Sequence, residues 1–211
     1  PSLYAKMVEH FPSGSHFVEV GTWKGMSACF MAVEIINSNK NIKFDCVDNW
    51  EYVENLQYDL PKELYKDLYE IFLNNIKPVR DIINPVKSLS WEGAANYADN
   101  SLDFVFIDAS HDYENVKKDI NAWYPKVKDG HILSGHDYNA EEVQQAVNEV
   151  VPKVFVRDDI NGQSFNPEDV LQNEETLNGC SSCWWQVPQV GQHYWEEQFG
   201  ISPGGAPPGP R

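Results

Sequence analysis

The stretch that most constrains the fold is residues 17–27, which read FVEVGTWKGMS. Apolar residues alternate up to Gly21, and a second glycine, Gly25, precedes an apolar run that begins at Met26. This pattern predicts a buried strand, a glycine-bent turn and the first turn of a helix. Such a turn lets backbone N–H groups approach a ligand at the positive end of a helix. Glu19 would repel a pyrophosphate but could hold an ammonium group, so the loop favours a nucleoside that carries an amino acid over a dinucleotide.

A second predicted strand completes a β-α-β unit. A helix over residues 26–37 is followed by a polar turn and a strand over residues 42–47, which ends at Asp48. Asp48 lies 27 residues after Gly21, and a carboxylate at this place can accept hydrogen bonds from both hydroxyls of a ribose. A plain loop or capping role is the alternative for Asp48.

The rest of the chain continues to alternate between strand and helix patterns. Further strands are predicted over residues 82–86, 102–107, 131–134, 154–156 and 182–187, and further helices over residues 3–10, 62–76, 91–98, 113–123 and 139–150. This alternation predicts a single α/β domain with a Rossmann-like, doubly wound, mostly parallel seven-stranded sheet, helices on both faces and an antiparallel edge. We assign residues 1–200 to this domain and residues 201–211 to a tail rich in Pro and Gly.

Two helices carry more detailed predictions. In the helix over residues 62–76, the spacing predicts that Leu64, Leu68, Ile71 and Phe72 face inward. Asn139 and Glu142 have the spacing of a capping box for the helix over residues 139–150. The segment 50–82, rich in aromatic residues, could shape a substrate pocket or pack against a partner subunit.

One triplet, His-Asp-Tyr, occurs twice, after two neighbouring predicted strands. It begins at His111, just past the strand that ends at Asp108, and again at His136. Because the carboxyl ends of parallel strands share one edge of a sheet, Asp108, His136 and Asp137 could converge on one divalent cation. Asp137 as a helix cap and His136 as an ordinary polar residue are the alternatives. His111 is placed to act as a general base toward a substrate hydroxyl.

Composition excludes several classes of partner. The formal net charge of −16 argues against nucleic acid and against an anionic membrane surface. We find neither an apolar run long enough to cross a bilayer nor a signal peptide at the start of the sequence. The four cysteines are too few for a disulfide scaffold, and the pair at Cys180 and Cys183 lacks a clear fourth ligand for zinc. We therefore expect a cytoplasmic protein.

Four stretches together resemble the class I S-adenosylmethionine-dependent methyltransferases, and most of all their small O-methyltransferase branch of catechol-type and sugar- or antibiotic-modifying enzymes. They are EVGTWKGMS at 19–27, DNW at 48–50, SLDFVFIDASHDY at 101–113 and GHDY at 135–138. The resemblance implies that the amino-acid end of S-adenosylmethionine lies against the loop, the ribose at Asp48 and the adenine near Ser90. The cofactor-binding residues that it implies are Glu19, Gly21, Thr22, Trp23, Gly25, Ser27, Asp48, Asn49, Ser90, Trp91 and Asp108.

The same resemblance implies the chemistry. In the metal-dependent relatives, an acid at the position of Asp108 and a pair matching His136 and Asp137 hold a cation such as Mg²⁺, and the base falls at His111. The predicted function is methyl transfer to a hydroxyl of a small molecule or a saccharide, with Asp108 and His111 as catalytic residues. The alternatives are a non-catalytic binding module, or an NAD(P)-dependent oxidoreductase, which would need a G-x-G-x-x-G loop. The sequence does not decide whether the protein forms a homo-oligomer.

Overall fold

The computed structural model describes residues 2–54, 56, 61–151, 155–157 and 183–186. The helices are α1 (Ser2–His10), α2 (Met26–Ser38), α3 (Leu68–Asn75), α4 (Ser90–Gly93), α5 (Tyr113–Trp123) and α6 (Glu141–Val150). The strands are β1 (His16–Val20), β2 (Lys43–Asp48), β3 (Ile83–Lys87), β4 (Leu102–Ile107), β5 (Val127–Gly135), β6 (Phe155–Arg157) and β7 (Cys183–Gln186). Within the described part, no helix is both long and apolar enough to cross a bilayer.

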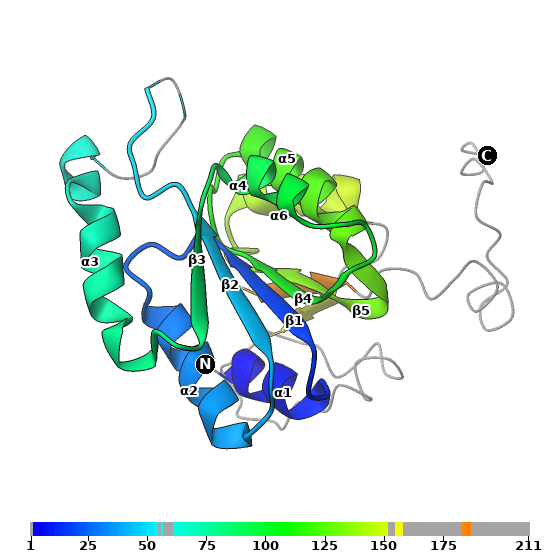
Figure 1. The fold of residues 1–211 in the computed structure, drawn as a ribbon. Coiled ribbons are helices and arrows are strands. Elements are labelled where there is room, and N and C mark those ends of the chain that lie inside the picture. The colour runs from blue at the N-terminus through cyan, green and yellow to red at the C-terminus, as the bar shows by residue number, and fades with distance from the viewer. Residues whose placement is uncertain (1, 55, 57–60, 152–154, 158–182, 187–211) are drawn as a thin grey trace, which may run out of the picture.

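Five strands form a parallel sheet in the order β3-β2-β1-β4-β5 (Figure 1). The order runs outward from β1 in both directions, so the chain switches direction between β1 and β4. In a sheet of this kind, ligands bind beside the carboxyl ends of the strands at the switch point. The predicted single Rossmann-like α/β domain is confirmed.

Helices cover both faces of the sheet, and a separate core lies on each face (Figure 1). The core against α1, α2 and α3 is rich in aromatic residues, whereas the core against α4, α5 and α6 is mostly aliphatic. Because side chains alternate along a strand, Phe17 and Glu19 point to the aromatic face, and Val18 and Val20 point to the other. Glu19 is therefore carried into the interior by the strand itself.

Beyond β5, the described residues include two short strands, β7 and β6, both in antiparallel pairing. The residues between these strands, and those after Gln186, lie outside the described part of the chain. The predicted count of seven strands therefore remains a prediction, as does the boundary between the domain and the tail at residues 201–211. Cys180 also lies outside the described residues.

The predicted helix over residues 62–76 is shorter than expected. Residues Lys62–Tyr65 form a 3-10 turn, and the backbone then reverses at Asp67, whose φ is +55°, before α3 begins. Leu68 and Phe72 are buried as predicted, but Leu64 and Ile71 are 44% and 37% exposed. Because the helix is interrupted at Asp67, one continuous apolar face does not run through residues 62–76.

The predicted capping box at Asn139 and Glu142 is wrong. Helix α6 begins at Glu141, with Ala140 as the residue before it, and no side chain caps this end. The Glu142 carboxylate accepts a hydrogen bond from the backbone N–H of Tyr113 at 2.9 Å. Glu142 thus links α6 to the first residue of α5 instead of capping its own helix.

Candidate active site at the carboxyl ends of the strands

The loop after β1 is held against the end of β4 by a glycine. Gly21 has φ +84°, and a Cβ atom built on it would lie 2.1 Å from the backbone oxygen of Asp108. Its N–H donates to the Val47 carbonyl in β2. A side chain would therefore meet the backbone, which cannot move aside as a flexible side chain could. Gly21 is the point at which the ends of three strands meet.

Asp48 fixes the shape of this loop. Its Oδ2 accepts hydrogen bonds from the backbone N–H groups of Thr22 and Trp23, each at 2.8 Å, and its Oδ1 accepts one from Trp50 at 2.7 Å. Burial raises the pKa of Asp48, and the backbone hydrogen bonds oppose that rise. The structure thus gives Asp48 a role in the loop itself, and the ribose contact remains a prediction.

The segment after β2 packs against the same loop. The buried Trp50 indole donates to the Trp23 carbonyl at 3.0 Å and packs on Phe72 of α3, with ring centroids 4.5 Å apart. Gly25 leaves room for Phe72, whose ring atoms would lie 2.9–3.0 Å from a Cβ at that position. The aromatic segment therefore holds the loop in place by packing.

Glu19 lies under the loop and is almost completely buried. Its Oε1 accepts a hydrogen bond from the Ser27 hydroxyl in the first turn of α2, and the buried Tyr4 hydroxyl also favours the charged form of this carboxyl group. Burial raises the pKa of Glu19 to about 8, and the Ser27 hydrogen bond opposes this rise. A buried carboxyl group at the end of β1 fits the expectation of a bound ammonium group, because a nearby positive charge would favour its ionised form.

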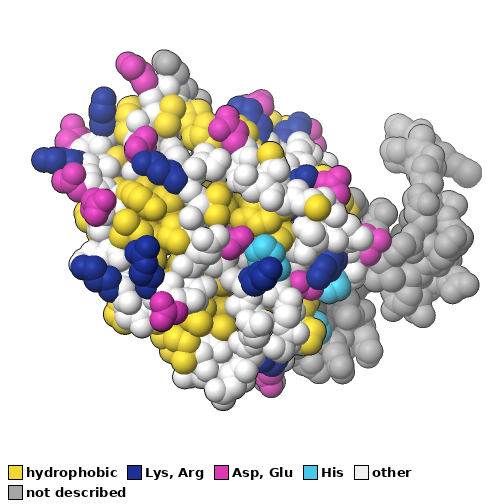
Figure 2. Space-filling model, in the orientation of Figure 1, with side chains coloured by type: hydrophobic (Ala, Val, Ile, Leu, Met, Phe, Trp, Pro, Cys, Tyr) yellow, Lys and Arg dark blue, Asp and Glu magenta, His cyan; other side chains and the backbone are white. Residues whose placement is uncertain are grey.

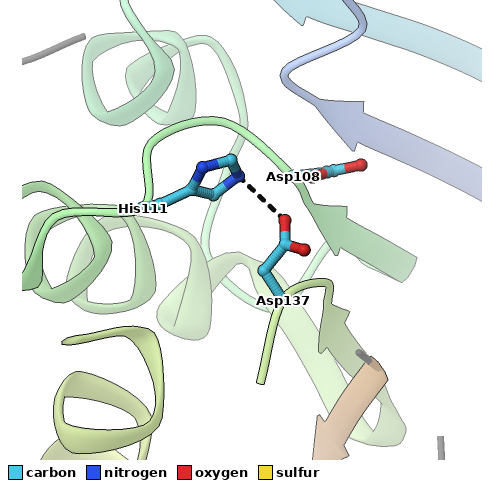
Figure 3. A group of neighbouring side chains, drawn as sticks. All are labelled: Asp108, His111 and Asp137. Atoms are coloured by element: carbon cyan, nitrogen blue, oxygen red, sulfur yellow. Dashed lines mark ion pairs between the residues drawn. The ribbon is translucent and has the colours of Figure 1, made fainter. Parts of the chain in front are cut away.

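The loops after β4 and β5 bring Asp108, His111 and Asp137 close together (Figure 3). His111 Nε2 lies 2.8 Å from Asp137 Oδ2, and His136 Nδ1 lies 3.0 Å from Asp137 Oδ1 and 3.9 Å from Asp108 Oδ1. The hydrogen bond from His111 and the smaller effect of that from His136 hold the pKa of the Asp137 carboxyl group well below its usual range. Burial raises the pKa of Asp108, which the charge of His136 opposes.

Three side chains at this edge have the spacing that a divalent cation would need, and they differ in part from the predicted group. Ligand atoms of Asp108, His111 and Asp137 all lie within 4.8 Å of one another. The sequence analysis predicted Asp108, Asp137 and His136 as the metal ligands, and it predicted His111 as the general base. Two carboxylates and one imidazole suit Mg²⁺, Mn²⁺ or a similar divalent cation. The donor set therefore fits a cation.

The predicted adenine end lies where α4 begins. Ser90 is the first residue of α4, and the Trp91 ring lies under Lys118, whose Nζ is 5.0 Å from the ring centroid. Asn49 follows β2, and its Oδ1 accepts a hydrogen bond from the backbone N–H of Glu51.

Sequence reasoning missed Asp119, which lies beneath Ser90 and is fully buried. The helical spacing in the sequence could have revealed it, because Asp119 shares the buried face of α5 with Val116, Ile120 and Trp123. A carboxylate on such a face needs a reason for its burial.

A family model described as a methyltransferase domain matches residues 18–138, which is more than half of the chain. The chain belongs to this methyltransferase family. The match begins within β1 and ends just after Asp137, so it spans the strand ends described above. A search of curated proteins gave no match to this methyltransferase.

Solved structures share the fold of this methyltransferase at low identity. The O-methyltransferase NovP has a TM-score of 0.56 at 17% identity, over 89% of this chain and 78% of that one. A SAM-dependent O-methyltransferase from Thermotoga maritima has a TM-score of 0.57 at 10% identity, over 89% of this chain and 64% of that one. A precorrin-6y C5,15-methyltransferase from Geobacter metallireducens GS-15 has a TM-score of 0.53 at 10% identity, over 87% and 84%. The class I methyltransferase fold is thus shown, and the branch is not.

Proposed function

We propose that this methyltransferase uses S-adenosylmethionine to methylate a hydroxyl group of a small molecule or a sugar. The observation that carries the proposal is the pairing of His111 with Asp137 next to Asp108, at the edge of the sheet that also holds the glycine loop. A hydroxyl must lose its proton to become a good nucleophile, and a histidine fixed by a carboxylate supplies a base for that step.

The residues of the loop fit the amino-acid end of the cofactor. Glu19 offers a buried carboxyl group under the loop, which suits an ammonium group. The loop also presents the N-terminus of α2 to a carboxylate, with Ser27 in its first turn. When bound, S-adenosylmethionine supplies a methyl group activated by a positive sulfur.

His111 takes the proton in this proposal. Because Asp137 Oδ2 faces Nε2 of His111, the neutral ring keeps its proton on Nε2, and the lone pair lies on Nδ1. His111 would accept the hydroxyl proton while the oxygen takes the methyl group that the bound cofactor would supply. Asp137 also stabilises the imidazolium that results. Much of the acceleration comes from holding the reacting atoms in line.

Assistance by a divalent cation belongs to the same proposal. Asp108 and Asp137 are common to the predicted metal group and to the group that the structure brings together. A cation held by these two carboxylates, with His111 left as the base, would lower the pKa of a substrate hydroxyl. Titration of Mg²⁺ and Mn²⁺ into the protein with cofactor bound, followed by chelation, tests this part: turnover unaffected by a chelator would remove the cation from the proposal.

The test of the whole proposal measures S-adenosylhomocysteine formed from S-adenosylmethionine with a panel of catechols, phenols and nucleotide sugars. The unmodified protein is expected to turn over at least one hydroxyl acceptor. His111→Ala should lower turnover by about 10²–10⁴-fold and leave the affinity for S-adenosylhomocysteine nearly unchanged. His131→Ala is the matched control, because His131 pairs with Asp103 away from this group.

Three outcomes would contradict the proposal. Undiminished turnover in His111→Ala would exclude the base role. Binding of S-adenosylhomocysteine without turnover of any acceptor would favour a non-catalytic binding module. Binding of NAD in its place would favour an oxidoreductase.

A further inference from the structure

A buried carboxyl group lies directly behind the predicted adenine end of the site. Asp119 on α5 has no exposed surface, and its Oδ1 accepts a hydrogen bond from the Ser90 hydroxyl at 2.5 Å. Its Oδ2 makes no hydrogen bond to the described residues. Ser90 itself is only partly buried, so it lies between this interior carboxyl group and the surface.

Further contacts fix Ser90 and its helix against α5. The Trp123 indole donates a hydrogen bond to the Ser90 carbonyl at 3.0 Å, and Lys118 lies over the ring of Trp91. Ser90 is therefore held at its backbone by Trp123 and at its hydroxyl by Asp119. A polar group held in this way presents a fixed hydrogen-bonding character to a ligand.

The direction of the hydrogen bond between Ser90 and Asp119 decides whether the Ser90 hydroxyl donates to a ligand or accepts from it. Burial raises the pKa of Asp119 to about 7, and the negative charge of Asp112 contributes to this rise. The hydrogen bond from Ser90 and the positive charge of Lys118 oppose it. In mildly alkaline solution the carboxylate is ionised and can only accept hydrogen bonds, so the single hydroxyl proton of Ser90 must point to it. The Ser90 oxygen then offers only lone pairs to any other partner.

We propose that Asp119 is a positioning residue that makes the Ser90 hydroxyl a hydrogen-bond acceptor, so that the site selects a nucleoside base with an exocyclic amino group over one with an oxo group. Adenine donates from its amino group, whereas hypoxanthine presents an oxygen that would face the lone pairs of Ser90. The proposal rests on the proposed function and on the adenine position that the sequence resemblance implies, because it assumes that the cofactor's base lies beside Ser90. It goes further by assigning selectivity to a residue that does not touch the cofactor.

The experiment compares the affinities of S-adenosylhomocysteine and S-inosylhomocysteine by calorimetry at about pH 8, where Asp119 is mostly ionised. The unmodified protein should prefer the adenosyl ligand by about tenfold or more. Asp119→Asn should reduce that preference by about three- to tenfold, because an amide can donate to Ser90 and release its hydroxyl proton toward the ligand. Glu114→Gln, at an exposed carboxylate on the same helix, should leave the preference unchanged.

The ratio of the two affinities separates selectivity from a general loss of structure. A purely structural effect of Asp119→Asn would weaken both ligands equally and leave the ratio at its original value, which would overturn the proposal. If Asp119→Asn does not fold, Ser90→Ala replaces it: the preference should again fall, and an unchanged preference would again overturn the proposal. Failure of the unmodified protein to bind either ligand would instead contradict the proposed function.

Discussion

Burial raises the pKa of Glu19 to about 8, so this carboxyl group is mostly protonated at neutral pH in the ligand-free protein. The folded protein then binds the proton more tightly than the unfolded chain, in which the pKa is near 4.5. By linkage, the contribution of Glu19 to stability is fully present below about pH 4.5 and is lost as the pH rises toward about 8.

Replacement of Glu19 by Gln tests this charge state. We expect the melting temperature of Glu19→Gln to exceed that of the unmodified protein by several degrees at about pH 8, with a smaller difference at about pH 5. The amide stays neutral at both values, whereas the carboxyl group must lose its proton in the interior. Scanning calorimetry of both proteins across the pH range checks this, and a gap that narrows with rising pH would contradict it.

Gly21 offers a test of the contact between the loop and β4. Gly21→Ala combines a positive φ with a Cβ at 2.1 Å from a backbone oxygen, so it should destabilise the protein by ~3 kcal/mol or more. Gly14→Ala is the matched control: its φ is +96°, but nothing lies within 4 Å of its Cβ. It should cost only about 1 kcal/mol of backbone strain. Urea unfolding measures both, and equal losses would show that the close approach is unimportant.

The sequence predicted which residues gather at the active site better than it predicted their partners. Asp108, His111, His136 and Asp137 lie at one edge because parallel strands end on the same side, which follows from strand patterns alone. Which histidine faces which carboxylate depends on loop conformation, such as the φ of +55° at Asp137. No periodic pattern encodes that angle.

At the scale of elements, α3 connects the aromatic segment to the glycine loop after β1. Phe72 is fully buried beneath Gly25, whereas its neighbour Ile71 is 37% exposed. Phe72→Ala should therefore lower the free energy of unfolding by about 3–5 kcal/mol, and Ile71→Ala by less than about 1.5 kcal/mol. Chemical denaturation of the two variants checks the difference. Similar losses would mean that α3 packs through a different face.

Element boundaries explain the two predictions that failed. The pattern over residues 62–76 was assumed to be one helix, but the backbone turns at Asp67, so Leu64 lies outside α3. Within α3, Leu68 and Phe72 face inward, whereas Ile71 is partly exposed. Glu142 has the spacing of a capping box, yet a tertiary hydrogen bond to Tyr113 uses its carboxylate. Local patterns do not contain the position of a neighbouring helix.

At the scale of the whole molecule, the excess of acidic residues should weaken the folded state at low ionic strength. The formal net charge of −16 causes repulsion that salt screens. We expect the melting temperature to rise by a few degrees between about 20 mM and about 300 mM NaCl, with KCl giving the same result. A fall in the melting temperature would mean that ion pairs such as Lys117–Glu149 contribute more than the repulsion.

The class of the fold was predictable because alternating strand and helix patterns are long and regular between residues 16 and 150. The parallel order around β1 follows from the same alternation, together with the right-handed crossover of β-α-β units. The interior pair of Ser90 and Asp119 was not predictable, since it joins helices whose relative placement appears only in three dimensions.

The pairing of β1 with β4 has a consequence for the order in which the protein folds. Phe17 lies beside Phe104 in this pairing, and Gly21 then meets Asp108. Contacts between residues so distant in the sequence form slowly, because the intervening chain must first be brought into a closed loop. During synthesis, the glycine loop therefore remains without its contact at Asp108 until β4 has been made, and binding of a nucleoside to this loop would report on the addition of β4 to the sheet.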